Sequence, residues 1–141
     1  MQIRIKKLAP TAIMPSFAHT SDAGMDLFTL ESIEIRAGTR ILIPTGLSMA
    51  IPEGYVGLIW DKSGLSNKGG LKVLGGVVDA GYRGEILVGL LNTSDADYIF
   101  EAGQKIAQMI IQKVEHPEFI EVSELDSTER GNGAFGSTGV Y

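Results

Sequence analysis

Glycine and proline residues divide this chain into short apolar runs, and their spacing constrains the fold more than any other feature of the sequence. Eighteen of the 141 residues are glycine, about 13% against a usual ~7%. Between the turns lie Ile41–Ile43, Leu47–Ile51 and Tyr55–Trp60, with a turn expected at Pro44–Gly46. Short apolar runs between closely spaced turn residues are typical of an all-β sandwich or barrel. The sequence therefore predicts an all-β fold.

Three further segments refine this prediction. Glu85–Asn92 carries apolar residues on both faces, so we expect a strand buried on both, in a core or in a subunit contact. Lys105–Val114 lacks glycine and proline. Its apolar spacing also permits a helix, but its β-branched residues and its strand neighbours favour a strand. At most one short helix is expected, at Ser63–Lys68, with Ser63 as its N-cap.

The chain shows no internal repeat and no linker, and it therefore reads as one domain with a distinct tail. Residues 1–126 are expected to form the β domain. Ser123–Tyr141 has few large apolar side chains, and Arg130–Gly139 holds four glycines. Such a segment cannot pack a core. Residues 127–141 are therefore predicted to be a flexible tail, either a mobile terminus or a lid.

Composition excludes several classes of function. The chain has no cysteine, which rules out disulfides and cysteine-based zinc or iron–sulfur sites. Its formal net charge of −5 argues against a nucleic-acid-binding protein, which needs a basic face. The uncharged stretch Ile41–Pro52 is broken by two prolines and a glycine and falls short of the ~20 apolar residues of a membrane-spanning helix. We therefore expect a cytoplasmic protein that binds neither nucleic acid nor membrane.

Polar groups set among glycines are the candidates for chemistry. Lys62-Ser63-Gly64 offers a cation, a hydroxyl and backbone N–H groups at the start of the expected helix, where anions are favoured, although a simple capped turn is as good a reading. Asp79 and Tyr82 lie across a tight turn. The apolar residues Val77 and Val78 before it are expected to hold Asp79 against a dry wall, where a carboxylate can act as a base.

The tail adds a cation, an aromatic ring and two hydroxyls through Arg130, Phe135, Ser137 and Thr138. Such a set suits a ligand that has both a ring and phosphates. Each of these signals is weak alone, but together they indicate a nucleotide ligand.

The order of these motifs resembles that of the trimeric deoxyuridine triphosphate nucleotidohydrolases. All five motifs of that family have a counterpart, in order, over most of the chain: Ala23–Leu27, Lys62–Leu65, Gly76–Gly84, Gly103–Gln108 and Arg130–Gly139. The resemblance implies a distorted jelly-roll or β-clip-like fold and a homotrimer whose active sites are shared between subunits. It also implies Mg²⁺-dependent hydrolysis of dUTP to dUMP and pyrophosphate.

The resemblance assigns roles to the hairpin residues of this chain. Asp79 is expected to activate the water that attacks the α-phosphorus. Tyr82 is expected to pack under the deoxyribose and leave no room for a 2′-hydroxyl. Uracil recognition falls mainly on backbone groups of Gly76, Val77 and Val78 and on the region of Leu87.

The phosphates are assigned to other motifs. Lys62, Ser63, Gly64 and Gln108 are expected to contact them. Mg²⁺ is expected to be held mainly by the substrate phosphates, with Asp26 acting indirectly through water. From the tail, Arg130 should reach the γ-phosphate and Phe135 should stack on uracil, while Gly136, Ser137 and Thr138 close over the phosphates.

The chain departs from the family pattern in several places. Asp61-Lys62 replaces Pro-Arg, and because lysine is a point charge, the bidentate phosphate contact of arginine is lost. The Asp61 carboxylate must point away from the phosphates. Val73 stands where many bacterial members have asparagine, so uracil recognition rests on the backbone. Ala134 replaces a tail glycine. Gln104-Lys105 replaces Asp-Arg and is expected to matter little.

Two alternatives remain. The related dCTP deaminases carry a catalytic glutamate in the strand after the hairpin, where this chain has Gly89. A nucleotide-binding regulatory trimer that has lost catalysis is the other. The presence of Asp79, Tyr82, Arg130 and Phe135 argues against that loss without proving turnover.

Overall fold

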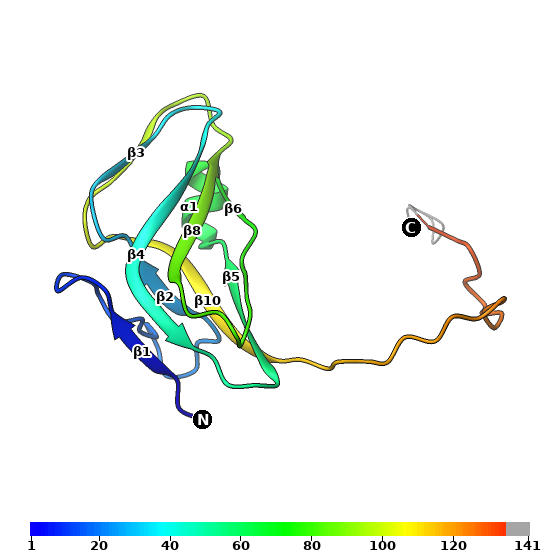
Figure 1. Cartoon of the computed structure of the whole chain (residues 1–141). Coiled ribbons are helices and arrows are strands. Elements are labelled where there is room, and N and C mark those ends of the chain that lie inside the picture. The colour runs from blue at the N-terminus through cyan, green and yellow to red at the C-terminus, as the bar shows by residue number, and fades with distance from the viewer. Residues whose placement is uncertain (135–141) are drawn as a thin grey trace.

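The computed structural model describes residues 1–134 of the chain. Within this range it consists of short antiparallel strands and one helix, α1 (Ser63–Gly69), which confirms the predicted all-β class (Figure 1). The first sheet has the order β1 (Arg4–Lys7), β4 (Arg40–Ala50), β8 (Glu85–Asn92), β6 (Leu71–Leu74). The second has the order β2 (Met25–Phe28), β10 (Lys105–Lys113), β5 (Tyr55–Trp60), β7 (Val77–Val78). A ribbon of β3 (Ile33–Ile35) and β9 (Tyr98–Phe100) completes the structure.

One apolar core joins the two four-stranded sheets. Ile43 and Val88 of the first sheet and Leu27 and Met109 of the second belong to it, and none is more than 1% exposed. Alternation of side chains along each strand sends these residues inward and their neighbours outward. The core therefore fixes which residues face outward on both sheets, and these include the candidate site residues.

Strand β4 differs from the expectation of a turn at Pro44–Gly46. The chain runs through this point as one strand, and its register with β8 shifts between Pro44 and Ser48. Gly46 has a φ of 69°, and a Cβ there would lie 2.9 Å from the Cβ of Ala12. Proline and glycine here form a bulge, which a long strand accommodates. The prediction of two separate strands was wrong.

Strand β8 has the predicted bounds but only one fully buried face. Ile86, Val88 and Leu90 are at most 1% exposed, whereas Leu87 on the other face is 40% exposed in the single chain. Two neighbours on the same outer face of the sheet, Leu42 and Leu74, are also exposed. We call Leu42, Leu74 and Leu87 the outer apolar face. The prediction of burial on both faces therefore does not hold within one chain.

The remaining two element predictions had mixed outcomes. Lys105–Lys113 is a strand, as expected, because it pairs with β2 on one side and β5 on the other. The short helix is also present, but its N-cap is Lys62, and Ser63 is the first helical residue. The predicted cap was therefore one residue too late.

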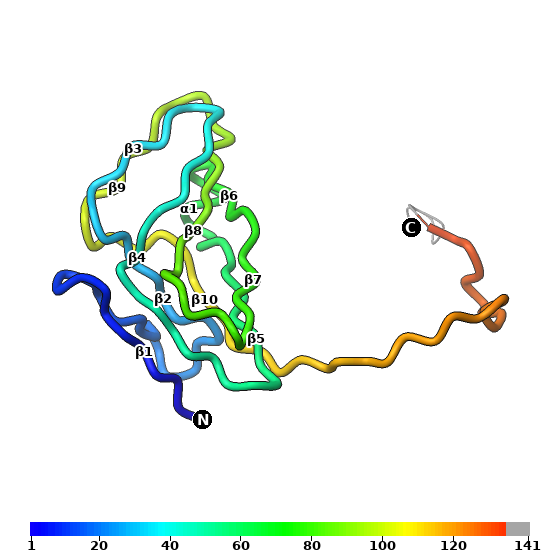
Figure 2. Tube along the Cα trace, in the orientation of Figure 1, coloured from blue at the N-terminus to red at the C-terminus, as the bar shows by residue number. Residues whose placement is uncertain are grey.

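The chain leaves the sheets after β10. The N–H of Val114 donates to the carbonyl of Gly54 at 2.9 Å, and the chain then continues as an extended segment (Figure 2). Phe119 and Leu125 in this segment are 90% and 86% exposed. Among the described residues, no helix has the length and apolar character needed to cross a membrane.

Candidate active site

A small pocket lies against the hairpin that the sequence singled out. Its volume is about 190 Å³. Most of the predicted nucleoside-binding residues line it, and we call it the hairpin pocket. Its lining residues are Ile59, Gly76, Val77, Val78, Asp79, Tyr82, Glu85, Ile86 and Leu87.

Gly76 allows the backbone of the hairpin to approach strand β5 closely at this pocket. Its φ is 102°, and a Cβ there would lie 2.7 Å from the carbonyl oxygen of Ile59. The Ile59 N–H in turn donates to the Gly76 carbonyl at 2.7 Å. Because only glycine fits this close approach, the wall of the pocket is backbone and offers peptide groups to a ligand.

Tyr82 is fixed across the hairpin. Its backbone N–H donates to the Asp79 carbonyl at 3.0 Å, and its hydroxyl donates to the Glu85 carbonyl at 2.9 Å. A Cβ on Gly84 would overlap the end of the Tyr82 side chain, so glycine at this position lets the ring lie over the turn. The Glu85 carboxylate accepts the N–H of Gly46 at 2.7 Å, which ties the hairpin to the bulge of β4. The Tyr82 ring is thereby held as a rigid wall of the pocket.

Asp79 lines the pocket but is solvent-exposed in the single chain. Val77 beside it is 67% exposed, and only Val78 is buried. Among residues 1–134 the expected dry wall is therefore absent, because Val77 is exposed on the edge strand β7. Any desolvation of Asp79 has to come from a ligand or from another copy of the chain.

A second group of predicted residues centres on a buried carboxylate. Asp26 on β2 is 3% exposed and sits between two ammonium groups. Lys62 Nζ donates a hydrogen bond to Oδ1, and Lys105 Nζ lies 2.6 Å from Oδ2. Burial raises the pKa of Asp26, but the Lys105 and Lys62 ammonium groups outweigh it and hold the pKa below its usual range. We call Asp26, Lys62 and Lys105 the Lys–Asp–Lys cluster.

Lys105 is the residue that sequence reasoning missed. Its substitution was expected to matter little, yet its ammonium group forms half of the pairing of Asp26. Its place in the fourth motif was the available signal.

Gln108 adjoins the cluster and is held by both neighbouring motifs. Its Nε2 donates to the Asp61 carbonyl at 2.8 Å, and a Cβ on Gly24 would collide with its side chain. The Asp61 carboxylate is turned toward β6, where it accepts the Val73 N–H and pairs with Lys72, both at 2.6 Å. The acid of the second motif therefore does point away from Lys62.

Ser63 and Gly64 follow Lys62 as the first, exposed residues of α1. Space around Gly64 is open, because a Cβ there would meet no atom within 4 Å. The two exposed residues and the cluster together make a polar, cationic surface suited to phosphate groups.

The structure thus brings the predicted residues into two groups, and strand register separates these groups. Asp26 lies opposite Gln108 and Gln108 opposite Trp60, while Val78 lies opposite Gly57. Three interstrand spacings and an offset of about four residues put Asp26 and Asp79 roughly 20 Å apart.

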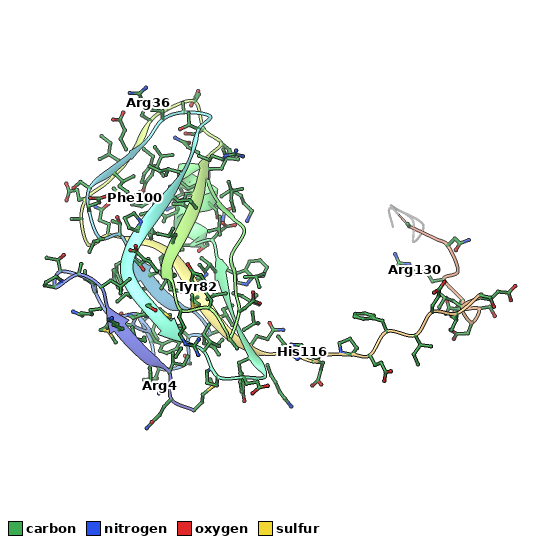
Figure 3. The ribbon with its side chains drawn as sticks, in the orientation of Figure 1. Arg4, Arg36, Tyr82, Phe100, His116 and Arg130 are labelled. Carbon is green, nitrogen blue, oxygen red and sulfur yellow. The ribbon has the colours of Figure 1, made fainter. Side chains whose placement is uncertain are left out.

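Arg130, the one predicted tail residue that the structure describes, is apart from both groups. Arg130 Nε donates to the Gly133 carbonyl at 3.0 Å, and Figure 3 shows Arg130 well away from Tyr82. The predicted residues Phe135, Gly136, Ser137 and Thr138 lie outside the described residues.

The described residues contain no group of three or more His, Cys, Asp or Glu side chains that would hold a metal ion. Asp26 already faces an ammonium group with each oxygen. The described residues therefore do not form a carboxylate cage that would hold Mg²⁺ by itself.

Comparison with known proteins identifies the family to which the chain is related. A family model described as dUTPase matches residues 11–139. The deoxyuridine 5'-triphosphate nucleotidohydrolase of Thermobifida fusca (strain YX) is 46% identical over 144 residues, covering 100% of this chain and 80% of that protein. The protein of the same name from Rhodococcus erythropolis is also 46% identical, covering 100% of this chain and 88% of that protein.

Solved structures agree with this relationship. Staphylococcus bacteriophage 80alpha dUTPase with dUPNHPP superposes with a TM-score of 0.93 at 33% identity, over 99% of each chain. A mutant dUTPase from phage phi11 of S. aureus, described as coordinating a structural Mg(II) ion, has a TM-score of 0.82 at 31% identity, over 88% of this chain and 98% of that one. Since sequence and fold agree over most of its length, the chain belongs to the dUTPase family.

Proposed function

We propose that this protein hydrolyses dUTP to dUMP and pyrophosphate by in-line attack of water on the α-phosphorus, with Mg²⁺ as cofactor. The observation that carries the proposal is the hairpin pocket, which combines exposed peptide groups, a fixed tyrosine ring and a carboxylate. Relatives named deoxyuridine 5'-triphosphate nucleotidohydrolase support it. The reaction would remove dUTP from the cytoplasmic nucleotide pool and supply dUMP for dTMP synthesis.

Backbone groups account for recognition of the base. Gly76, Val77 and Val78 present peptide N–H and C=O groups beside Leu87 in the hairpin pocket, and these pair with the edge of uracil. The Tyr82 ring packs under the deoxyribose. The hydrogen bond from the Tyr82 hydroxyl to the Glu85 carbonyl favours the ring position that leaves no room for a 2′-hydroxyl.

Asp79 serves as the general base. It lines the same pocket as Tyr82, so a water between its carboxylate and the α-phosphorus is in position to attack. General-base assistance contributes roughly 10²- to 10⁴-fold to the rate. Asp79 accepts a proton from the water as the water oxygen bonds to the α-phosphorus. The bond between the α-phosphorus and the oxygen that bridges to the β-phosphate breaks, and pyrophosphate leaves with that oxygen.

Lys62, Ser63, Gly64 and Gln108 bind the phosphates. Mg²⁺ would be held mainly by the phosphates themselves, and when bound it neutralises charge that develops on the leaving pyrophosphate. Asp26 acts on the metal only through water, because each of its oxygens already faces an ammonium group. Arg130 completes the charge at the γ-phosphate, with Phe135, Gly136, Ser137 and Thr138 closing the site.

The separation of the two residue groups supports a homotrimer with shared sites. Asp26, which holds Lys62, lies roughly 20 Å from Asp79 in the same chain by strand spacing, a separation that favours one dUTP being bound by the two groups from different copies. One copy supplies the hairpin pocket and another the Lys–Asp–Lys cluster. The outer apolar face and the exposed apolar residues of the extended segment, Phe119 and Leu125, would be covered by neighbouring copies.

Deamination of dCTP finds no support at the position where it needs a carboxylate. A Cβ on Gly89 would lie 3.0 Å from the carbonyl oxygen of Leu74. A glutamate at this position would need the Leu74 backbone to shift by a few tenths of an ångström, and the chain itself supplies no carboxylate there.

Pyrophosphate release with Mg²⁺ tests the proposal, with dUTP, dCTP, dTTP and UTP offered separately to the full-length protein. We expect release from dUTP and none from the other three above background. Binding of dUTP without release would overturn the proposal in favour of a regulatory nucleotide-binding protein.

A further inference from the structure

The Lys–Asp–Lys cluster joins three segments that are far apart in the sequence around one carboxylate. The Asp26 side chain is 4% exposed, whereas those of Lys62 and Lys105 are 28% and 45% exposed. The carboxylate is thus buried, while both lysine side chains remain partly exposed. One buried lysine would suffice to neutralise the Asp26 carboxylate, whereas this cluster has two partly exposed lysines.

Each ammonium group has hydrogen-bonding capacity beyond its pairing with Asp26. An ammonium carries three N–H donors and no acceptor. Lys62 uses one of its donors on Asp26 Oδ1, and Lys105 forms an ion pair with Oδ2 at 2.6 Å. Two like charges repel one another, and their long side chains have many rotamers. A carboxylate between them lowers the repulsion, and pairing with it keeps both ammonium groups beside the same side chain.

We propose that Asp26 is a positioning residue that holds Lys62 and Lys105 as a paired clamp, and that Lys105 is a second phosphate-binding residue beside Lys62. The ligand is the pair of phosphates that leaves as pyrophosphate; this inference rests on the proposed function. Exposed Ser63 and Gly64 extend the same cationic surface.

The clamp also explains how a lysine serves at a position where a bidentate contact is needed. A guanidinium offers two parallel N–H donors, and a single ammonium is a point charge. Two ammonium groups fixed on one carboxylate offer two point charges at a set separation. Lys105 thereby supplies the second contact that Lys62 alone lacks.

The direct test measures pyrophosphate binding by calorimetry, alongside hydrolysis of dUTP. In Lys105→Met we expect pyrophosphate affinity to fall roughly 10-fold or more, with KM for dUTP raised more than kcat is lowered. Lys105→Arg should restore most of the affinity. Lys113→Met is the matched control, because Lys113 is on the same strand with a side chain 74% exposed and should bind pyrophosphate as the parent does.

Asp26→Asn separates positioning from simple charge. Removal of a negative charge should tighten anion binding if only net charge matters, whereas loss of positioning should weaken it. We expect weaker pyrophosphate binding in the folded variant, judged by circular dichroism and trimer size. Tighter or unchanged binding would overturn the positioning role of Asp26, and Lys105→Met decides the role of Lys105 if Asp26→Asn does not fold.

The two proposals fail in different ways. If the parent protein hydrolyses dUTP but Lys105→Met binds pyrophosphate as tightly as Lys113→Met, the clamp is wrong and the function stands. If the parent binds pyrophosphate through Lys105 but hydrolyses no dUTP, the function is wrong and the clamp stands. No pyrophosphate binding by the parent would overturn the clamp.

Discussion

The hairpin pocket and the Lys–Asp–Lys cluster, which we propose as the nucleoside-binding and phosphate-binding regions, differ in what holds them together. The pocket depends on shape: Gly76 lets backbone approach backbone, and Tyr82 is locked across the turn. The cluster depends on charge: a buried carboxylate holds two half-open ammonium groups. Local turn geometry sets the shape of the pocket, so ligand binding there should depend little on salt. The charges of the cluster come together only where distant strands pair, and ligand binding there should depend on salt and pH.

The largest expected effect separates chemistry from phosphate binding. Asp79→Asn should lower kcat for dUTP roughly 10²- to 10⁴-fold, because the amide cannot accept the proton of the attacking water. Pyrophosphate affinity should be unchanged, since Asp79 belongs to the other residue group. Single-turnover kinetics and calorimetry measure the two quantities, with Asp95→Asn, an exposed aspartate outside the site, as the control. Parent-like hydrolysis by Asp79→Asn would show that another group is the base.

The next effect tests the shape of the pocket. Gly76→Ala should raise KM for dUTP by an order of magnitude or more and lower the free energy of unfolding by about 1–3 kcal/mol. Its Cβ would press on the Ile59 carbonyl at 2.7 Å, and its φ is 102°.

Gly75→Ala is the matched control for this change. Gly75 also has a positive φ, 70°, but a Cβ there would meet nothing within 4 Å. It should cost similar backbone strain while leaving KM nearly unchanged. Equal KM values for the two variants would mean that strain, and not the contact with Ile59, governs the pocket.

The salt dependence of ligand binding should differ between the two regions, with a smaller effect than the substitutions above. Raising NaCl from 0.05 to 0.5 M should weaken pyrophosphate binding several-fold, because the Debye length falls from above ~10 Å to below it. Binding of deoxyuridine, which has no phosphate, should change little. Competition assays at each salt concentration measure both ligands. Equal salt dependence would contradict the assignment of charge to one region and shape to the other.

The smallest expected effect concerns pH and stability. The pKa of Asp26 is held below its usual range in the folded protein, so its ionised form stabilises the fold above the unfolded-state pKa. This contribution is lost as the pH falls through the folded-state pKa. Asp26→Asn should therefore lose less stability than the parent between pH 5 and pH 3, in urea titrations at each pH. A parallel decline in both proteins would show that Asp26 does not contribute.

Local sequence patterns predicted the parts of the molecule that local geometry determines. The strands Glu85–Asn92 and Lys105–Lys113 and the hairpin with Asp79 and Tyr82 depend on alternation and turn residues, and all are present. Pro44–Gly46 misled because the same residues that make a turn also make a bulge inside a long strand.

Contacts between distant segments could not be predicted in this way. Lys105 reaches Asp26 because β10 pairs with β2 in one particular register, and nothing near either residue specifies that register. The same holds for Asp61, whose carboxylate turns to Val73 and Lys72 on β6. The exposure of Val77 and Leu87 likewise depends on which distant segments pack against them, and in the single chain none covers them fully.

Subunit complementation tests most directly whether each active site combines these two regions from different copies of the chain. Asp79→Asn, with an intact cluster, and Lys62→Met, with an intact hairpin pocket, would be co-refolded at equal amounts and assayed with dUTP. Random assembly of a trimer with shared sites predicts recovery of about a quarter of the parent activity, because that fraction of sites joins two intact halves. Activity of the mixture no greater than the mean of the two variants alone would contradict the account.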